Sequence, residues 1–316
     1  MMKIAVLFAG YGSQYVGMGK DIYDQSRLMQ EYFEEANSCL NRDFTKLCFA
    51  STELDLSSAE IAYPALFLVH AGIWALLKEQ GVQPALVAGD NLGTYAALFA
   101  AQGVSFPDAL YLLNKYAVIY QEALAGMGSV GILQVTDMET AALQKLCDKV
   151  SKKDQQASIA IYCSDSKNIV SGTSAAIDVL QEAATQAGAE VHELPIEYGL
   201  HSSLLDTAAQ SFALYLTKVD FKDTAFTLID TITGKSLHTA DDIKELVVNL
   251  FNKPLHWEKT VQAAAQADLI VYVGANAQLV AAIQAQLPDK KIIAVNRWQD
   301  VETIKKVIDK QSSGLE

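Results

Sequence analysis

Short apolar runs alternate with longer amphipathic segments along this chain. The apolar runs predict buried strands at Ile4–Ala9, Leu86–Ala88, Leu228–Asp230, Leu269–Val273 and Ile292–Val295. Helical periodicity predicts helices at Met29–Leu40, Ala65–Gln80, Gly93–Gln102, Phe106–Ala125, Ser202–Thr217, Asp241–Leu250, Trp257–Ala267 and Ala277–Ala285. This alternation predicts an α/β fold, with a parallel sheet that helices cover on both faces.

The middle of the chain has a different order of elements. Strands are expected at Gly128–Val135, Ala157–Cys163, Asn168–Ser171 and Glu190–Leu194, with helices at Asp137–Val150 and Ser174–Ala187. The order βαββαβ is that of a ferredoxin-like unit. We therefore predict a large domain of residues 1–126 and 196–316, interrupted by a small ferredoxin-like domain of residues 127–195. Junctions of this kind commonly hold ligand clefts.

Gly89-Asp90-Asn91-Leu92-Gly93 has the frame of a nucleophile elbow, because it joins a buried strand to a helix. In a G-x-S-x-G elbow, the strained turn exposes a serine at the head of the sheet. Asn91 occupies the serine position here, and an amide cannot replace an activated hydroxyl as nucleophile. Asn tolerates unusual backbone, which gives Asn91 a structural explanation. Its amide could instead bind a ligand, or the substitution could be engineered to trap a substrate.

Six motifs, in order from residue 3 to about residue 300, carry a family resemblance. They are Phe8-Ala9-Gly10-Tyr11-Gly12-Ser13-Gln14 with Gly17-Met18-Gly19, Tyr63-Pro64-Ala65-Leu66, the elbow, Tyr198-Gly199-Leu200-His201-Ser202, Pro254-Leu255-His256-Trp257 and Val273-Gly274. Together they resemble the motifs of malonyl-CoA:acyl-carrier-protein transacylases. The resemblance implies an α/β-hydrolase-like large domain with a parallel sheet, and an inserted ferredoxin-like small domain.

The resemblance also implies a site and a reaction. In the family, a serine activated by a histidine attacks the malonyl thioester, two backbone N–H groups stabilise the oxyanion, and an arginine holds the malonyl carboxylate. His201 matches the histidine, and the N–H groups would be those of Tyr11 and Leu92. Asn91 stands at the serine position, and Tyr116 stands at the arginine position.

Further positions differ from the family pattern. Asp90 replaces a histidine, and a carboxylate there would repel a malonyl group or act as a base. Tyr11 and Tyr63 replace glutamines, so that three polar positions around one cleft, including Tyr116, have become tyrosines. These rings could fill an unused cleft or line a pocket for an apolar ligand. Asn249 lies near another polar contact of the family, where the register of the motif is ambiguous.

Composition narrows the possible partners. The chain has 316 residues, 51% of them hydrophobic, and a formal net charge of −13, which argues against nucleic-acid binding. No apolar run reaches the roughly 18 residues that a transmembrane helix needs, so no membrane span is expected. Four cysteines without metal or disulfide spacing indicate reduced thiols in a cytoplasmic protein, with neither a metal nor a cofactor.

Two functions follow from these features. The first is a non-catalytic homologue in fatty-acid or polyketide assembly, which binds an acyl carrier protein, a pantetheine ligand such as acyl-CoA, or a synthase partner. The second is an acyltransferase or thioester hydrolase for neutral acyl groups, acting through His201 and water or through Asp90. An ordinary transacylase with one engineered change would not explain Asp90, Tyr11, Tyr63 and Tyr116 together.

Overall fold

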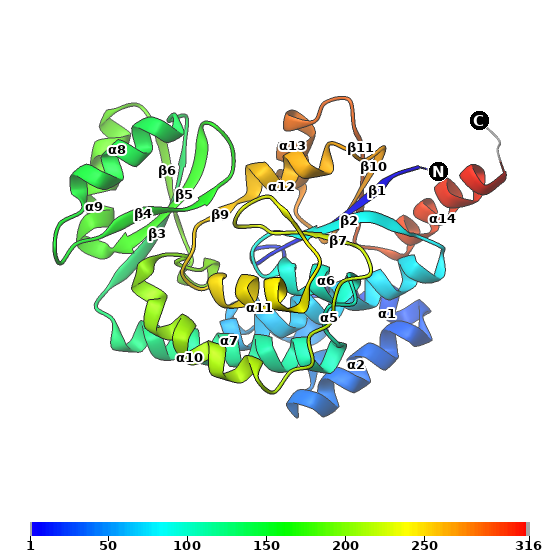
Figure 1. The fold of residues 1–316 in the computed structure, drawn as a ribbon. Coiled ribbons are helices and arrows are strands. Elements are labelled where there is room, and N and C mark those ends of the chain that lie inside the picture. Colours follow the sequence, from blue (N-terminus) through cyan, green and yellow to red (C-terminus); the bar gives the residue numbers. More distant parts are fainter. Residues whose placement is uncertain (1, 314–316) are drawn as a thin grey trace.

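The computed structural model describes residues 2–313, whose strands form two sheets. Figure 1 shows the larger sheet at the centre of the molecule and the smaller one beside it, covered on its outer side by helices α8 and α9. The larger sheet has the order β11-β10-β1-β2-β7-β8, and the smaller one β6-β3-β5-β4-β9. The mixed α/β architecture confirms the predicted fold class.

The larger sheet is parallel from β11 to β7, and only the short strand β8 runs antiparallel. Its strands are β1 (Ile4–Phe8), β2 (Pro84–Gly89), β7 (Thr227–Ile229), β8 (Ser236–Leu237), β10 (Leu269–Val273) and β11 (Lys291–Val295). β1 and β10 are buried at every position, which explains why both are continuous apolar runs. The carboxyl ends of β1, β2 and β10 lie together, so the turns that follow them meet at one edge of the sheet.

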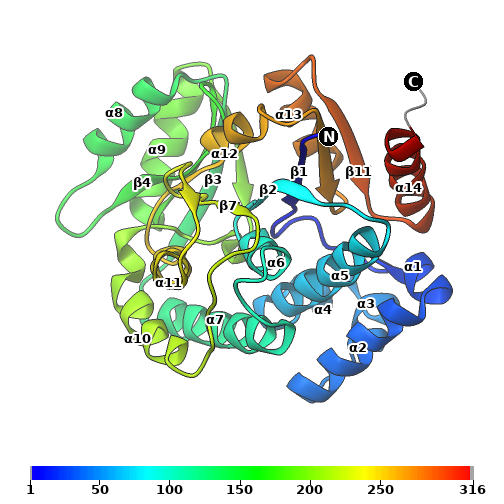
Figure 2. The same ribbon diagram turned by 45° about the vertical axis from the view of Figure 1, so that its right-hand side comes forward.

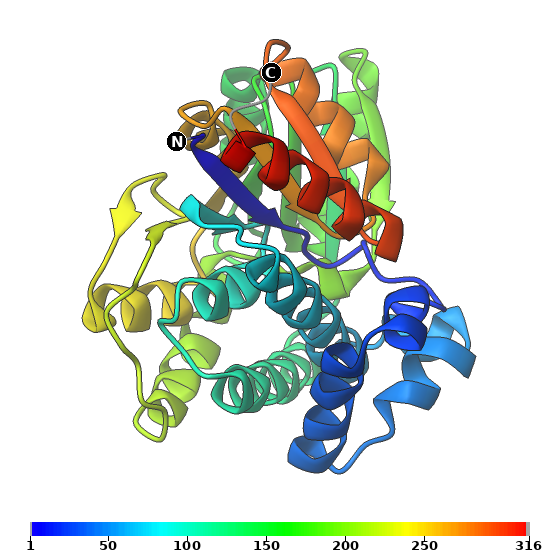
Figure 3. The same cartoon turned by 90° about the vertical axis from the view of Figure 1, so that its right-hand side faces the viewer.

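Helices cover both faces of this sheet. Helix α14 crosses one face in Figure 3, and Figure 2 places α5 and α6 on the other side of the strands from α13. The helices of the large unit are α1 (Lys20–Gln25), α2 (Arg27–Leu40), α3 (Phe44–Ala50), α4 (Glu53–Ser57), α5 (Ala59–Glu79), α6 (Gly93–Ala100), α7 (Phe106–Gly126), α10 (Asp206–Leu216), α11 (Ala240–Asn249), α12 (Trp257–Ala264), α13 (Ala277–Gln286) and α14 (Trp298–Ser313).

The smaller sheet has the strand order expected of a ferredoxin-like unit. Its elements are β3 (Val130–Thr136), α8 (Thr140–Val150), β4 (Ala157–Tyr162), β5 (Lys167–Thr173), α9 (Ser174–Gln186) and β6 (Glu190–Leu194). The strands pair antiparallel in the order β6-β3-β5-β4. A further strand, β9 (Leu255–His256), joins β4 in parallel from the large unit. The division into domains at residues 127 and 195 stays a prediction, because β9 links the two parts through backbone hydrogen bonds.

Helix α5 corrects the expectation that no segment is apolar enough to span a membrane. Among residues 2–313 it is the one helix that qualifies by length and composition, with a mean hydropathy of 1.5 over its best window. However, 83% of that window is buried inside the fold, as in the core helix of a globular protein. Glu60 and Lys78 lie near the two ends of the helix, so the uncharged stretch between them is shorter than the run that the sequence criterion requires.

Candidate functional site

The turn after β2 has the geometry of an elbow. Asn91 has a φ of 50°, in the left-handed region that non-glycine residues rarely adopt. A Cβ at Gly89 would collide with the backbone of Gly93 and Thr94, and a Cβ at Gly93 would collide with the carbonyl of Phe8. Both glycines are therefore required for the chain to turn this tightly against β1.

The Asn91 side chain forms a hydrogen bond within the protein. Its Nδ2 donates a hydrogen bond of 2.6 Å to the carbonyl of Tyr198, and only 3% of the residue is exposed. Two tyrosines bind the two preceding carbonyls. The Tyr63 hydroxyl donates to the carbonyl of Glu197 at 2.8 Å, and the Tyr120 hydroxyl donates to the carbonyl of Ile196 at 2.6 Å. We call these three donors, Asn91, Tyr63 and Tyr120, the carbonyl clamp. It holds the 3₁₀ turn Ile196–Tyr198, which leads to His201.

His201 is buried and neutral. Its Nδ1 lies 2.7 Å from the carbonyl of Leu250, and it has a φ of 42°. Burial lowers the pKa of His201 to about 4, although the hydrogen bond with the Leu250 carbonyl opposes this shift. Nε2 has no hydrogen-bond partner among the described residues, and a Cβ added at Gly199 would stand 2.6 Å from it. The free nitrogen is therefore covered by the backbone at Gly199.

An aromatic cluster surrounds Tyr116, the residue that the resemblance aligns with the family's arginine. Tyr116 is 2% exposed and stacks on Phe251, with ring centroids 3.8 Å apart. Its ring also contacts Tyr63, at 6.0 Å and at a steep angle, and Tyr63 contacts Tyr11 in the same way. The remaining members of the cluster are Tyr120, Tyr198 and Phe212.

Four tyrosines of the aromatic cluster donate their hydroxyl hydrogen bonds to backbone carbonyls, two of them in the carbonyl clamp. The Tyr11 hydroxyl donates to the carbonyl of Ser57 at 2.8 Å, and the Tyr116 hydroxyl makes a long bond of 3.4 Å to the carbonyl of Leu250. Burial raises the pKa of Tyr11 to about 12 and keeps these hydroxyls protonated. The structure thus brings Tyr11, Tyr63 and Tyr116 together as packing residues.

The two backbone N–H groups expected at an oxyanion hole remain available. Neither the N–H of Tyr11 nor that of Leu92 donates a hydrogen bond to another residue in the range 2–313. Orphan N–H groups at the start of a helix form a favourable place for a carbonyl or an anion. Leu92 is the residue from which α6 begins.

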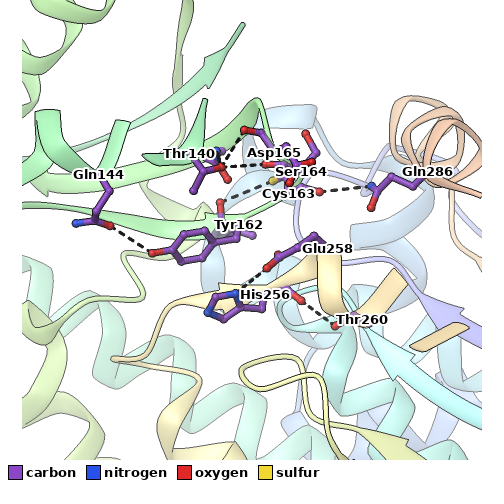
Figure 4. Close-up of polar contacts among 12 residues, drawn as sticks. Thr140, Gln144, Tyr162, Cys163, Ser164, Asp165, His256, Glu258, Thr260 and Gln286 are labelled. Atoms are coloured by element: carbon purple, nitrogen blue, oxygen red, sulfur yellow. Dashed lines mark hydrogen bonds and ion pairs between the residues drawn. The ribbon is translucent and has the colours of Figure 1, made fainter. Parts of the chain in front are cut away.

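Of the five elbow residues, only Asp90 lines a cavity of about 210 Å³. The cavity lies between the head of the larger sheet, the carboxyl end of β4 and helix α13. Its other lining residues are Gln134, Ile161, Cys163, Ser164, Lys167, Ile169, Tyr198, Trp257, Asn276, Gln278, Leu279, Ala282, Ala285 and Gln286. Figure 4 shows Gln286 reaching from α13 towards Cys163, whose carbonyl it binds at 3.4 Å. Asn91 and His201 do not line this space.

The carboxylate of Asp90 has no hydrogen bond or ion pair with any described residue. Its backbone is fixed, because its N–H donates to the carbonyl of Phe8 at 2.9 Å. Burial raises the pKa of Asp90 to about 7, so the carboxyl changes charge near neutral pH. A carboxyl group with this pKa can both accept and donate a proton.

Asn249 lies away from this cavity. It ends α11 and lines a surface groove with Leu216 and Val248. The residue after Asn249 does reach the site, because the carbonyl of Leu250 binds His201 and Tyr116. A sequence motif cannot reveal a contact that a backbone carbonyl makes. Sequence reasoning also missed Cys163 and Trp257 as cavity residues. In the range 2–313, no cluster of three or more His, Cys, Asp or Glu residues could hold a metal ion.

Comparison with known proteins identifies the family. The sequence model of the family described as "Acyl transferase domain" matches residues 6–307 of this chain. The malonyl CoA-acyl carrier protein transacylase of Bacillus subtilis (strain 168) is 30% identical over 313 residues, which cover 98% of this chain and 97% of that protein. This chain therefore belongs to the acyl transferase family, and the resemblance to malonyl-CoA:acyl-carrier-protein transacylases is confirmed.

Solved structures agree with this result. The malonyl CoA-acyl carrier protein transacylase from Clostridium perfringens superposes with a TM-score of 0.91 at 26% identity, and covers 99% of both chains. A malonyl-transacylase bound to its type II polyketide acyl-carrier protein superposes with a TM-score of 0.92 at 24% identity, over 96% of this chain and 99% of that one. The latter likeness shows the shared fold.

Proposed function

We propose that this protein is a family member that binds an acyl carrier protein or its acyl-pantetheine group without transferring malonyl by the serine mechanism. The observation that carries this proposal is the hydrogen bond from Asn91 to the carbonyl of Tyr198. At the position of the nucleophile, the side chain secures the turn before His201 instead of presenting an attacking atom. His201 has no hydroxyl to activate, and Gly199 covers its free nitrogen.

Loss of the malonyl anchor supports the same proposal. Tyr116 is packed against Phe251 where the family places an arginine, and a tyrosine cannot form the two-point contact that guanidinium makes with a carboxylate. The ionised form of Asp90 would also repel a malonyl carboxylate in the cavity. Neutral acyl groups fit this site better than malonyl does.

The cavity beside Asp90 is the place where we propose that the end of a pantetheine arm binds. Its volume of about 210 Å³ is smaller than the roughly 300–1,000 Å³ of a pocket for a whole ligand, so we assign it only the thioester end of the arm with a short acyl chain. Side-chain amides of Gln134, Asn276 and Gln286 supply donors and acceptors for the amides of pantetheine. A family relative has been solved with its acyl-carrier protein bound. We place the protein in the cytoplasm, alongside fatty-acid or polyketide assembly, where a synthase could be a further partner.

A second function is favoured by one specific observation. The unpartnered N–H groups of Tyr11 and Leu92 and the near-neutral pKa of Asp90 would suit hydrolysis or transfer of a neutral acyl thioester. In this case Asp90 would act as the base. His201 suits this role less well, because its pKa lies near 4 and its Nε2 is covered.

Two substitutions on α13 test the proposed site. Ala282 lines the cavity, whereas Ala281, one residue earlier on the same helix, is exposed and does not. We expect Ala282→Phe to weaken binding of a holo acyl carrier protein by tenfold or more in calorimetric titrations, and Ala281→Phe to change it less than twofold. Equal binding by both variants would contradict the proposed site, and an apo carrier that binds as tightly as the holo form would contradict a role for pantetheine.

A further inference from the structure

Cys163 follows directly after β4 and lies at the carboxyl end of that strand. It is partly exposed, while Cys48 and Cys147 are fully buried. Its side chain makes only a weak contact of 3.9 Å from Sγ to the carbonyl of Ile161. The backbone around it is fixed, since Gln286 binds its carbonyl (Figure 4). The structure thus holds a thiol in place at the wall of the cavity that Asp90 also lines.

A second, independent observation concerns a buried polar group of the cavity wall. Trp257 is another lining residue and is only 1% exposed, yet its indole Nε1–H has no acceptor among the described residues. A buried indole N–H without an acceptor is destabilising, so such a group is usually paired. An acyl thioester or a pantetheine amide would bring the missing acceptor oxygen into the cavity.

Asp90 and Cys163 line the same cavity, and the charge of Asp90 acts on the Cys163 thiol. Burial raises the pKa of the Cys163 thiol to about 12, and the negative charge of Asp90 is the next cause, whereas Lys167 opposes the shift. A thiol in this setting is protonated at neutral pH, so it needs a base to become a nucleophile. The unpartnered carboxylate of Asp90 is the base that the cavity offers.

We propose that Cys163 accepts the acyl group of a short, neutral acyl-pantetheine thioester, with Asp90 as the group that carries the proton. In this step the Cys163 proton passes to the Asp90 carboxylate, and Sγ attacks the carbonyl carbon. The bond from that carbon to the pantetheine sulfur breaks, and the departing sulfur takes the proton from Asp90. One thioester and one thiol are converted into another thioester and thiol, and no oxidant is required.

This inference rests on the proposed function, because it uses the same cavity for the same ligand class. It goes beyond the proposed function, because it assigns a nucleophile, Cys163, which follows a strand of the smaller sheet and does not belong to the elbow. Lys167 also lines the cavity and favours the developing thiolate. The reaction is expected to be slow, since burial disfavours the thiolate.

The test is intact-mass and peptide mass spectrometry of the full chain incubated with acetyl-CoA. Cys39 is exposed and away from the cavity, so it serves as the internal control for unassisted exchange with solvent-accessible thiols. We expect a single acetyl adduct, mapped to Cys163 and formed at least tenfold faster than any adduct at Cys39. Cys163→Ala should abolish it, Cys39→Ala should leave it unchanged, and Asp90→Asn should slow it tenfold or more.

An adduct on Cys39 alone, or no adduct at all, would overturn the proposal. So would equal rates in wild type and Asp90→Asn. Mapping on the wild-type protein keeps the test valid even where a variant fails to fold. Failure here is distinguishable from failure of the proposed function, because binding of a holo carrier is measured separately and does not require an adduct. Binding without acylation would refute only the role of Cys163.

Discussion

Tyr116 gives the sharpest test of the aromatic cluster. Its ring is 2% exposed, stacks on Phe251 at 3.8 Å and meets Tyr63 and Phe212 at steep angles. Truncation of a large buried aromatic ring typically costs about 3–5 kcal/mol, because packing is lost and a cavity remains. We expect Tyr116→Ala to lower the free energy of unfolding by about this amount. For 316 residues, it corresponds to roughly 5–8 °C in Tm, at about 2.1 cal/mol/K per residue.

A matched variant separates the ring from its hydroxyl. The hydroxyl bond to Leu250 is long, at 3.4 Å. Tyr116→Phe should therefore cost less than about 1 kcal/mol. Urea unfolding and calorimetry of the two variants would measure both values. A loss below about 1 kcal/mol for Tyr116→Ala would refute the reasoning, because it would mean that the ring faces an open cleft, where a substrate anchor could still operate.

Three further predictions concern charge and backbone. The pKa of Asp90 is raised to about 7 in the folded state, so stability falls as pH rises from about 4 to 7. Asp90→Asn should therefore stabilise the protein by about 2–4 kcal/mol at pH 8 and by less than about 1 kcal/mol at pH 4 in urea unfolding; equal effects would contradict the assigned shift. The pKa of His201 is lowered to about 4, so stability is lost as pH falls from 6.5 towards 4. His201→Gln should reduce this acid loss, leaving the part due to His70, which is shifted in the same way. Gly93→Ala, which would place a Cβ against the Phe8 carbonyl, should cost at least about 2 kcal/mol of unfolding free energy, and a neutral result would argue against the tight elbow.

Much of the fold was predictable, because the buried faces of long helices and strands give a clear pattern of hydrophobic positions. The predicted strand Leu269–Val273 coincides with β10, which is buried throughout, and Glu190–Leu194 coincides with β6. The short elements were missed: α1, α3, α4 and β8 span too few residues to show a period. The two-residue strand β9 was read as part of a motif, since its pairing with β4 depends on tertiary contacts.

The site was predictable only in part. The positions of Asn91, Tyr63 and Tyr116 followed from motifs, and the structure brings them together. The hydrogen bonds from Asn91 and Tyr63 to carbonyls of the turn Ile196–Tyr198 could not be predicted, because any residue type can supply a backbone carbonyl. The cavity was also hidden, since Cys163 and Trp257 come from segments that the fold alone brings beside Asp90.

The most direct test of the central claim is malonyl transfer from malonyl-CoA to a holo acyl carrier protein, measured for the wild-type protein and for Asn91→Ser. An active transacylase of the family serves as the reference, and an unfolding curve of Asn91→Ser is measured to check that the variant folds without its bond to Tyr198. We predict no transfer above the protein-free rate by either form, because our proposal assigns Tyr116 to the position of the anchor and because Gly199 lies against the free His201 nitrogen. Transfer by the wild-type protein, or recovery of the reference rate by Asn91→Ser alone, would contradict the account.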